Sequence, residues 1–239
     1  MVGETFIQGR LGDDISFSGV NVFDTYNADC IEMKPLGATI ENDYANNVGM
    51  SSFKLYRQKV KSHTLEMSFY VSGDSEEALQ ISISQLMAKA QNCVIRNANS
   101  DFEYPAILTS VEDEDTGVEF YHKVTLTFAA IKRMKLQTKT FTETSTFYNP
   151  GTIESGMRIA ATFSSAGDSV VNVNGYFLSN VISGIPFVID GIEGTVKQND
   201  VNRIQDTNIA RFPKVQPGWN TISVPDGCTA EVSWYPTYI

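Results

Sequence analysis

The residues of this chain whose types could do chemistry are not spaced in a way that assembles a reactive site. Asp113, Glu114 and Asp115 stand in a row. Two carboxyls can hydrolyse a glycosidic bond, but that mechanism needs them to face each other across a cleft. Adjacent acids in a polar segment that ends at Gly117 are more typical of a solvated hairpin turn. Their spacing also differs from that of a twelve-residue calcium loop.

The histidines and cysteines are too few and too scattered to predict a metal or redox site. His63 and His122 fall in register with the apolar faces of strands, which favours buried or half-buried rings. Cys30, Cys93 and Cys228 are odd in number and lack the short paired spacing of zinc or redox motifs. Buried, reduced thiols are expected. Because no nucleophile elbow, phosphate loop or dinucleotide fingerprint occurs either, the sequence predicts no catalytic, cofactor-binding or metal-binding residue.

The aromatic residues near the end of the chain allow two interpretations. Trp219, Trp234 and Tyr235 could form a platform on which the apolar face of a sugar stacks. In a small β domain such residues more often pack in a core or between domains. A carbohydrate-binding β-sandwich module therefore remains an alternative function, and a hydrolase using the three adjacent acids is a third.

The elements that carry these residues are mainly strands in the first half of the chain. Alternation from His63 to Val71 places four apolar side chains on one face, which predicts a half-buried antiparallel strand. Asp74 and Glu77 resemble a capping box that opens a helix through about Gln91. This is the one helix that the pattern predicts, and its apolar face is expected to lie on a sheet.

Two turns and an arm complete the prediction for this half. The apolar pattern changes face across Ser18-Gly19, which indicates a tight turn or bulge. The stretches 106–112 and 118–128 are predicted to form a long hairpin around a loop at 113–117. The stretch 50–61 has polar residues on both sides and predicts an exposed strand or arm, whose edge could pair with another subunit.

The composition changes between Lys135 and Thr152, and we place the domain boundary there, with domains at 1–140 and 141–239. Beyond it, short strands alternate with turn signals such as Asn174-Gly175, and Pro217-Gly218 suits a type II turn. The predicted strands are 157–163, 170–178, 185–190, 195–197, 219–224 and 230–235. The fold class is therefore mainly β, and the second domain is a β-sandwich or jelly roll.

Composition excludes several classes of function. The chain has 239 residues, of which 42% are hydrophobic and 19% charged, as in globular proteins. A formal net charge of −10 disfavours a grip on nucleic acid, which requires Lys and Arg against phosphates. No apolar run reaches the roughly 18–20 residues that span a bilayer, and a signal peptide is not evident. We expect a soluble protein that is made in the cytoplasm.

Several short motifs together resemble one family. They are Ile15-Ser16-Phe17-Ser18-Gly19, Asn149-Pro150-Gly151, Phe212-Pro213 and Pro217-Gly218-Trp219-Asn220-Thr221-Ile222. With the helix after Asp74 and the hairpin through Phe128, the chain resembles the distal tail proteins of long-tailed siphophages over nearly its whole length. A related baseplate or tail-tube subunit is the alternative within this class.

The resemblance implies a specific architecture and role. The N-terminal domain would be β-sandwich-like, with one helix and a long hairpin, and would form a six-membered ring around a channel. The C-terminal domain would be a galectin-like β-sandwich outside the ring. The implied partners are copies of the chain, the tail tube protein and the tail-tip or receptor-binding proteins, in the virion's tail tip after synthesis in the host cytoplasm. Sugar binding does not carry over, because the galectin pattern of His, Asn, Arg and Trp-Gly is absent.

Overall fold

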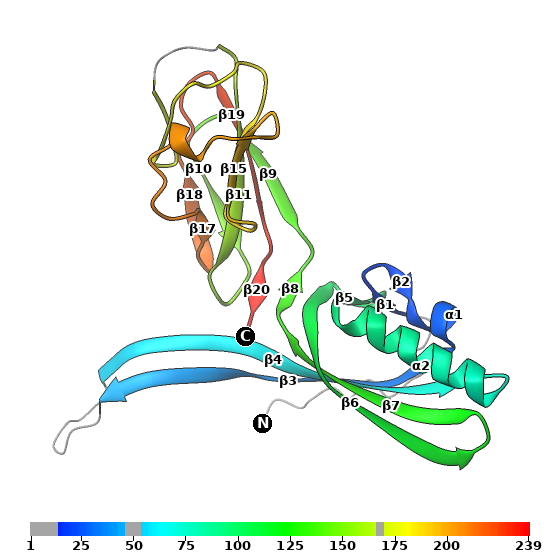
Figure 1. Cartoon of the computed structure of the whole chain (residues 1–239). Helices are drawn as coiled ribbons and strands as arrows, with labels where there is room; N and C mark the ends of the chain where they lie inside the picture. Colours follow the sequence, from blue (N-terminus) through cyan, green and yellow to red (C-terminus); the bar gives the residue numbers. More distant parts are fainter. Residues whose placement is uncertain (1–13, 46–53, 166–169) are drawn as a thin grey trace. The chain divides into compact units, whose positions relative to one another are not determined.

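The computed structural model describes residues 14–45, 54–165 and 170–239 (Figure 1). The chain divides into two compact units, which we call unit 1 (Met1–Lys132 with Ile239) and unit 2 (Arg133–Tyr238). The division falls before the boundary expected at 140/141, because strand β9 (Gln137–Phe141) pairs with a strand of unit 2. The mainly β fold class is confirmed.

Unit 1 contains seven described strands and two helices before β8 (Lys132–Met134), which spans the division between the units. They are β1 (Ile15–Phe17), β2 (Val20–Asn21), α1 (Val22–Tyr26), β3 (Ala28–Ala45), β4 (Lys54–Ser72), α2 (Glu76–Ala90), β5 (Asn92–Asn97), β6 (Phe102–Val118) and β7 (Tyr121–Ala130). The strands follow the order β2-β1-β5-β6-β7-β4-β3, and each neighbouring pair is antiparallel.

The core of unit 1 lies between this sheet and α2, which Figure 1 shows beside the strands. The buried face of the helix is the predicted one, formed by Leu79, Ile83, Leu86 and Ala90. On the sheet, the ring of Phe17 meets the rings of Phe69 and Phe128 edge-on, with centroids 6.0 Å apart in each case. Such edge-to-face pairs stabilise a core beyond the area that they bury. Strand alternation therefore determined the core correctly.

Two local predictions for unit 1 need correction. Ser75, not Asp74, caps α2, because its hydroxyl accepts from the amide of Ala78 at 3.2 Å. The short helix α1 was not expected. It begins after Asn21, whose side chain accepts from the amide of Asp24 at 3.0 Å, and ends at Asn27 in the left-handed region. The predicted turn at Ser18-Gly19 is confirmed, with φ values of 49° and 81°.

Unit 2 contains only short strands and one 3₁₀ turn among its described residues. After β9 these are β10 (Ser145–Asn149), β11 (Ser155–Phe163), β12 (Val171–Val173), β13 (Tyr176–Leu178), β14 (Phe187–Asp190), β15 (Thr195–Gln198), β16 (Val201–Asn202), η2 (Ile204–Asp206), β17 (Lys214–Val215), β18 (Gly218–Ile222), β19 (Cys228–Trp234) and β20 (Thr237–Tyr238). The larger sheet has the order β16-β15-β14-β11-β19-β9, and β10-β18 and β12-β13 form two smaller sheets.

Buried residues of the larger sheet and of both smaller sheets form one core in unit 2. Phe147 of β10 packs on Trp234 of β19, with ring centroids 4.7 Å apart. Val173 and Leu178, from β12 and β13, close the same core. The fold of this unit therefore depends on pairing between strands that are far apart in sequence.

Candidate assembly surfaces

The acidic run lies within a strand and not in the predicted loop. Asp113, Glu114 and Asp115 belong to β6, and Asp115 stands opposite His122 of β7. The hairpin turns at Glu119-Phe120 instead. The prediction of a loop at 113–117 was therefore wrong.

Gly117 serves a bulge and not the turn of this hairpin. Its φ is +74°, and the register between β6 and β7 shifts between Asp115 and Val118. The amide of Gly117 donates to the Asp115 carboxylate at 2.7 Å, and the Thr116 hydroxyl donates to the carbonyl of Tyr121 at 2.6 Å. The bulge places two extra residues, Thr116 and Gly117, in β6, and the pairing continues beyond them.

Pairing with β7 gives two of the three acids basic partners. The Nδ1 atom of His122 lies 2.8 Å from Asp113 Oδ1, and Lys123 Nζ lies 3.5 Å from Glu114 Oε2. These acids alternate along a strand and do not face each other across a cleft, as glycoside hydrolysis requires. Within the described ranges, no group of three or more His, Cys, Asp or Glu side chains is arranged to hold a metal ion.

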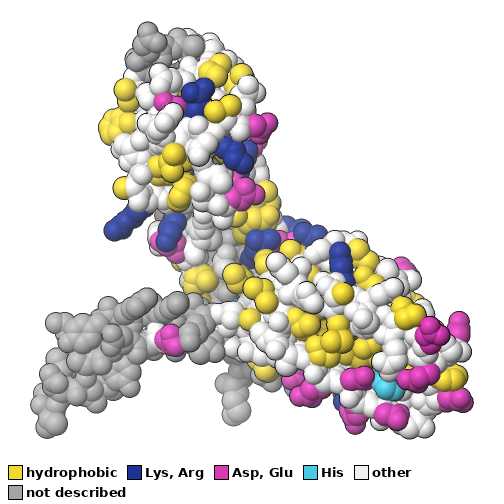
Figure 2. Space-filling view, in the orientation of Figure 1, with side chains coloured by type: hydrophobic (Ala, Val, Ile, Leu, Met, Phe, Trp, Pro, Cys, Tyr) yellow, Lys and Arg dark blue, Asp and Glu magenta, His cyan; other side chains and the backbone are white. Residues whose placement is uncertain are grey.

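The start of α2 adds further negative charge to this end of unit 1. The amide of Gly73 donates to the carbonyl of Phe120 at 3.1 Å, which joins the helix start to the hairpin turn. The acids of these segments, which we call the acidic end, are Asp74, Glu76, Glu77, Glu112, Asp113, Glu114, Asp115 and Glu119. All eight are exposed, and Figure 2 shows acidic side chains gathered here. An open pocket beside the turn is lined by Glu76, Asp115, Gly117, Val118, Glu119, Phe120 and His122.

The remaining candidate ligands are buried. His63 is 7% exposed, and its Nδ1 lies 3.3 Å from the carbonyl oxygen of Leu36, as expected for a satisfied core histidine. The three cysteines are free and buried, as predicted. Burial raises the pKa of Cys30 to about 12 and the pKa values of Cys93 and Cys228 to about 11. These thiols therefore stay protonated and poorly nucleophilic at neutral pH.

The three aromatic residues of the proposed platform do not form one surface. Trp234 is 1% exposed, and its indole N–H donates to the Asn149 side chain at 3.2 Å. Tyr235 packs under the guanidinium of Arg133, which lies 3.6 Å from the ring centroid. Trp219 is 73% exposed. The interpretation as a core residue is therefore correct for Trp234. Trp219 remains a candidate for contact with a ligand or a partner protein.

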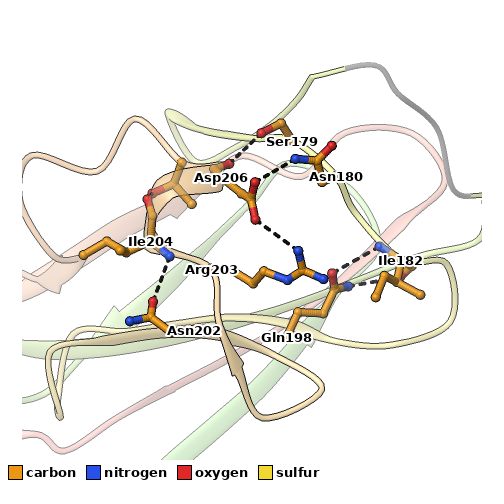
Figure 3. A network of polar contacts seen from close by, with 9 residues as sticks. Ser179, Asn180, Ile182, Gln198, Asn202, Arg203, Ile204 and Asp206 are labelled. Atoms are coloured by element: carbon orange, nitrogen blue, oxygen red, sulfur yellow. Dashed lines mark hydrogen bonds and ion pairs between the residues drawn. The ribbon is translucent and has the colours of Figure 1, made fainter.

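A partly buried polar network around Asp206 joins two loops of unit 2, and no sequence pattern indicated it (Figure 3). One carboxylate oxygen of Asp206 accepts from Asn180 at 2.7 Å, and the other accepts from Arg203 at 3.2 Å. The backbone carbonyl of Asp206 accepts from the Ser179 hydroxyl at 3.1 Å. Arg203 Nε is buried without a hydrogen-bond partner, but the other polar groups named here pair with one another. The network is therefore suited to fixing loops and not to reacting with a substrate.

Gln198 fixes the neighbouring loop through hydrogen bonds between its side-chain amide and the loop backbone (Figure 3). It is 1% exposed, and its Nε2 donates to the carbonyls of Ile182 at 3.0 Å and Ile185 at 2.8 Å. Its Oε1 accepts from the amide of Ile182 at 3.1 Å. The side chain thus uses the full hydrogen-bonding capacity of its amide except for one lone pair.

β3 and β4 extend beyond the sheet of unit 1 as an arm, defined here as residues 39–45 and 54–62. β7 pairs with β4 from His63 to Ser72. Earlier residues of β4 pair, within the described part of the chain, with β3 alone, for example Ile40 with Val60. Figure 1 shows the two strands continuing together past β7. The predicted arm at 50–61 is therefore strand from Lys54 onward, and its residues 50–53 lie outside the described ranges.

No protein-family model and no curated protein matches the sequence. Solved structures do match. The crystal structure of phage SPP1 Dit (gp 19.1), described as a paradigm of the hub adsorption apparatus in phages that infect Gram-positive bacteria, superposes with a TM-score of 0.73. The match is 15% identical and covers 95% of this chain and 99% of that one. The chain has the fold of this phage hub protein.

A second match is a chain from the baseplate of phage P2 in its activated, calcium-containing conformation. The TM-score is 0.53 at 8% identity, and the match covers 92% of this chain and 96% of that one. Both structural neighbours therefore come from phage hubs or baseplates, and both span almost the whole chain.

No described helix is long and apolar enough to cross a membrane.

Proposed function

We propose that this chain is a structural, non-enzymatic subunit of a phage tail tip. Copies of it would form a six-membered ring that joins the tail tube to the tail-tip or receptor-binding proteins. The likeness to SPP1 Dit over nearly the whole chain supports this role. The pairing of Asp113 and Glu114 with basic partners supports a role other than catalysis.

The observation that carries the proposal is the arm. A two-stranded hairpin is at best marginally stable by itself in water. Both outer edges of the arm lack a described strand partner, so its backbone groups can pair with another chain. Pro35 and the register shift up to Ala38 precede the arm and interrupt the edge of β3 where it still belongs to the sheet. A ring needs such a heterologous contact, in which one surface of each subunit fits a different surface of the next.

The charge of the chain is compatible with a channel through which DNA passes. The formal net charge is −10 per subunit, so a ring accumulates negative charge that repels phosphates. We expect acidic or neutral side chains along the channel. A density map of the ring with a channel rimmed mainly by Lys and Arg would contradict this expectation.

Shortening the arm tests the role in assembly. Residues 41–59 are replaced by Asn-Gly, so that Ile40 and Val60, which are opposed in the register, flank a two-residue turn. Native mass spectrometry of the full chain should show a ring of six copies, and the shortened variant should be a monomer. Phe177→Ala is the control, because Phe177 is an exposed residue of unit 2, and this variant should still form the ring.

Circular dichroism and the melting temperature distinguish lost assembly from lost folding. The core of unit 1 lies outside the replaced segment, so the strand signal of the shortened variant should persist. A full-length chain that stays monomeric at high concentration, alone and with tail partners, would refute the proposal. A shortened chain that still forms the ring would refute the role of the arm.

A further inference from the structure

Tyr148 and Trp219 form an exposed aromatic pair in unit 2. They stand directly opposite each other in the β10–β18 sheet, and their ring centroids lie 5.5 Å apart at an interplanar angle of 66°. Tyr148 is 51% exposed and Trp219 is 73% exposed. Trp234 of the same unit is buried, so this fold can enclose an indole and leaves Trp219 outside. Because the two exposed rings are adjacent, they form a continuous aromatic surface, which is typical of a contact site.

The turn that leads into Trp219 carries hydrogen-bonding side chains. Trp219 follows the turn Gln216-Pro217-Gly218, in which Gly218 has φ +85°. The Gln216 side-chain amide donates to one carboxylate oxygen of Glu154, and Lys214 Nζ donates to the other at 2.5 Å. These two hydrogen bonds hold the pKa of Glu154 below its ordinary value, so its carboxylate stays ionised as an acceptor.

The turn that presents Trp219 is fixed by a second side chain. Asn220 Oδ1 accepts from the amide of Gln216 at 2.9 Å, and its Nδ2 donates to the carbonyls of Gln216 at 2.8 Å and Gly218 at 3.0 Å. From the core side, Asn149 also donates to the Gln216 carbonyl, at 3.2 Å. A backbone turn held in this way loses little conformational freedom when a ligand binds.

The surroundings of the pair decide between classes of ligand. A protein contact typically surrounds a central aromatic residue with further apolar contacts, whereas the exposed neighbours here on the same strands are Thr146 and Thr221. Single-stranded nucleic acid needs a basic groove, but the charge of Lys214 is paired with Glu154. A saccharide has an apolar face of C–H groups for an aromatic ring and hydroxyls for amides and carboxylates. The local ion pair favours a neutral one.

We infer that Tyr148 and Trp219, together with Glu154 and Gln216, form a binding site for a neutral saccharide. The indole of Trp219 stacks on one face of a sugar ring, and Tyr148 borders it at an angle. The Glu154 carboxylate accepts from sugar hydroxyls, and Gln216 positions that carboxylate. This inference does not depend on ring assembly, because all four residues lie in one unit of one chain.

The two tryptophans of the chain provide a direct assay, because both lie in unit 2 and only Trp219 is exposed. The full-length protein is titrated with chitohexaose and with maltohexaose, which are neutral β-linked and α-linked oligosaccharides. A saturable blue shift of emission, together with protection from acrylamide quenching, is the expected result for at least one of them. Calorimetry then measures affinity for the variants that lack the fluorescent signal.

The variants assign the binding to this site. Trp219→Ala should abolish it, and Tyr148→Ala and Glu154→Ala should each weaken it about five-fold or more. Phe177 is an aromatic residue elsewhere in unit 2 that is exposed to nearly the same degree as Tyr148, and Phe177→Ala should leave the affinity unchanged. No saturable binding of either oligosaccharide at millimolar concentration would overturn the inference. So would affinity that Trp219→Ala leaves intact, or a loss of tail-partner binding in this variant without any saccharide binding.

Discussion

Asn149 should be one of the most sensitive positions of unit 2, although it is a polar residue beside a proline. Its side chain is fully buried and makes three hydrogen bonds. Oδ1 accepts from Trp234 Nε1 at 3.2 Å and from the amide of Gly151 at 3.1 Å, and Nδ2 donates to the carbonyl of Gln216 at 3.2 Å. The residue therefore links the buried tryptophan to the turn that carries Trp219.

The expected cost of Asn149→Ala follows from the partners that it leaves unpaired. The Gln216 carbonyl keeps its hydrogen bond from Asn220, at 2.8 Å. Trp234 Nε1 and the amide of Gly151 lose the partner that Asn149 gives them, and each buried, unsatisfied donor costs about 1–3 kcal/mol. We therefore expect the free energy of unfolding of unit 2 to fall by roughly 2–6 kcal/mol.

Trp234 fluorescence is the appropriate measurement, because its ring lies in the affected core. Urea unfolding is followed in a Trp219→Phe background, so that emission reports Trp234 alone. Asn220→Ala is the matched control. It removes an asparagine of the same turn that is only partly buried, so water replaces its hydrogen bonds and the cost should stay below about 1 kcal/mol. The reasoning fails if Asn149→Ala costs less than about 1 kcal/mol, or less than Asn220→Ala.

Three further outcomes follow from the packing. Gly191→Ala should destabilise unit 2 by about 1–3 kcal/mol or more, because the added Cβ would lie 2.1 Å from the carbonyl oxygen of Pro213. Gly37→Ala is the control, because no atom lies within 4 Å of the added Cβ, and it should be nearly neutral. Calorimetry measures the melting of both variants, and equal losses of stability would contradict the argument. The buried thiols should resist a disulfide reagent at pH 8 until the chain is denatured, and fast labelling of the native protein would contradict their burial. The thiols are those of Cys30, Cys93 and Cys228, and folding raises the pKa of each. The free energy of unfolding should therefore fall as the pH rises above about 9, where the thiols of the unfolded chain ionise.

The spacing of apolar residues correctly predicted the elements in which that spacing matches the face that the folded chain buries. The alternation at Leu65, Met67, Phe69 and Val71 correctly identified a buried strand face, and the helical spacing correctly identified the face of α2. The helix α1 was missed because five residues are too few for periodicity to show. The capping residue Asn21 and the left-handed Asn27 were its available signals.

The hairpin between β6 and β7 shows where local preference is overruled. Asp113 to Gly117 has the composition of a turn, yet it continues β6. Val124, Leu126 and Phe128 of β7 are buried in the core and fix the register of that strand. Because shifting the register by one residue would turn these side chains to the other face, pairing continues through the acids to Val118.

The sequence by itself determined the strand-rich class, the turns at Gly19 and Gly175, and which side chains of a strand or helix share an apolar face, because each depends on neighbours within a few residues. The tertiary structure alone decided that Trp234 is enclosed while Trp219 faces water. It also decided that, among the residues the structure describes, the arm of β3 and β4 pairs with no third strand. The physical reason is that burial and strand pairing are properties of contacts between remote segments. The type of a side chain determines how much free energy its burial would contribute, but only the folded chain shows whether the side chain is buried.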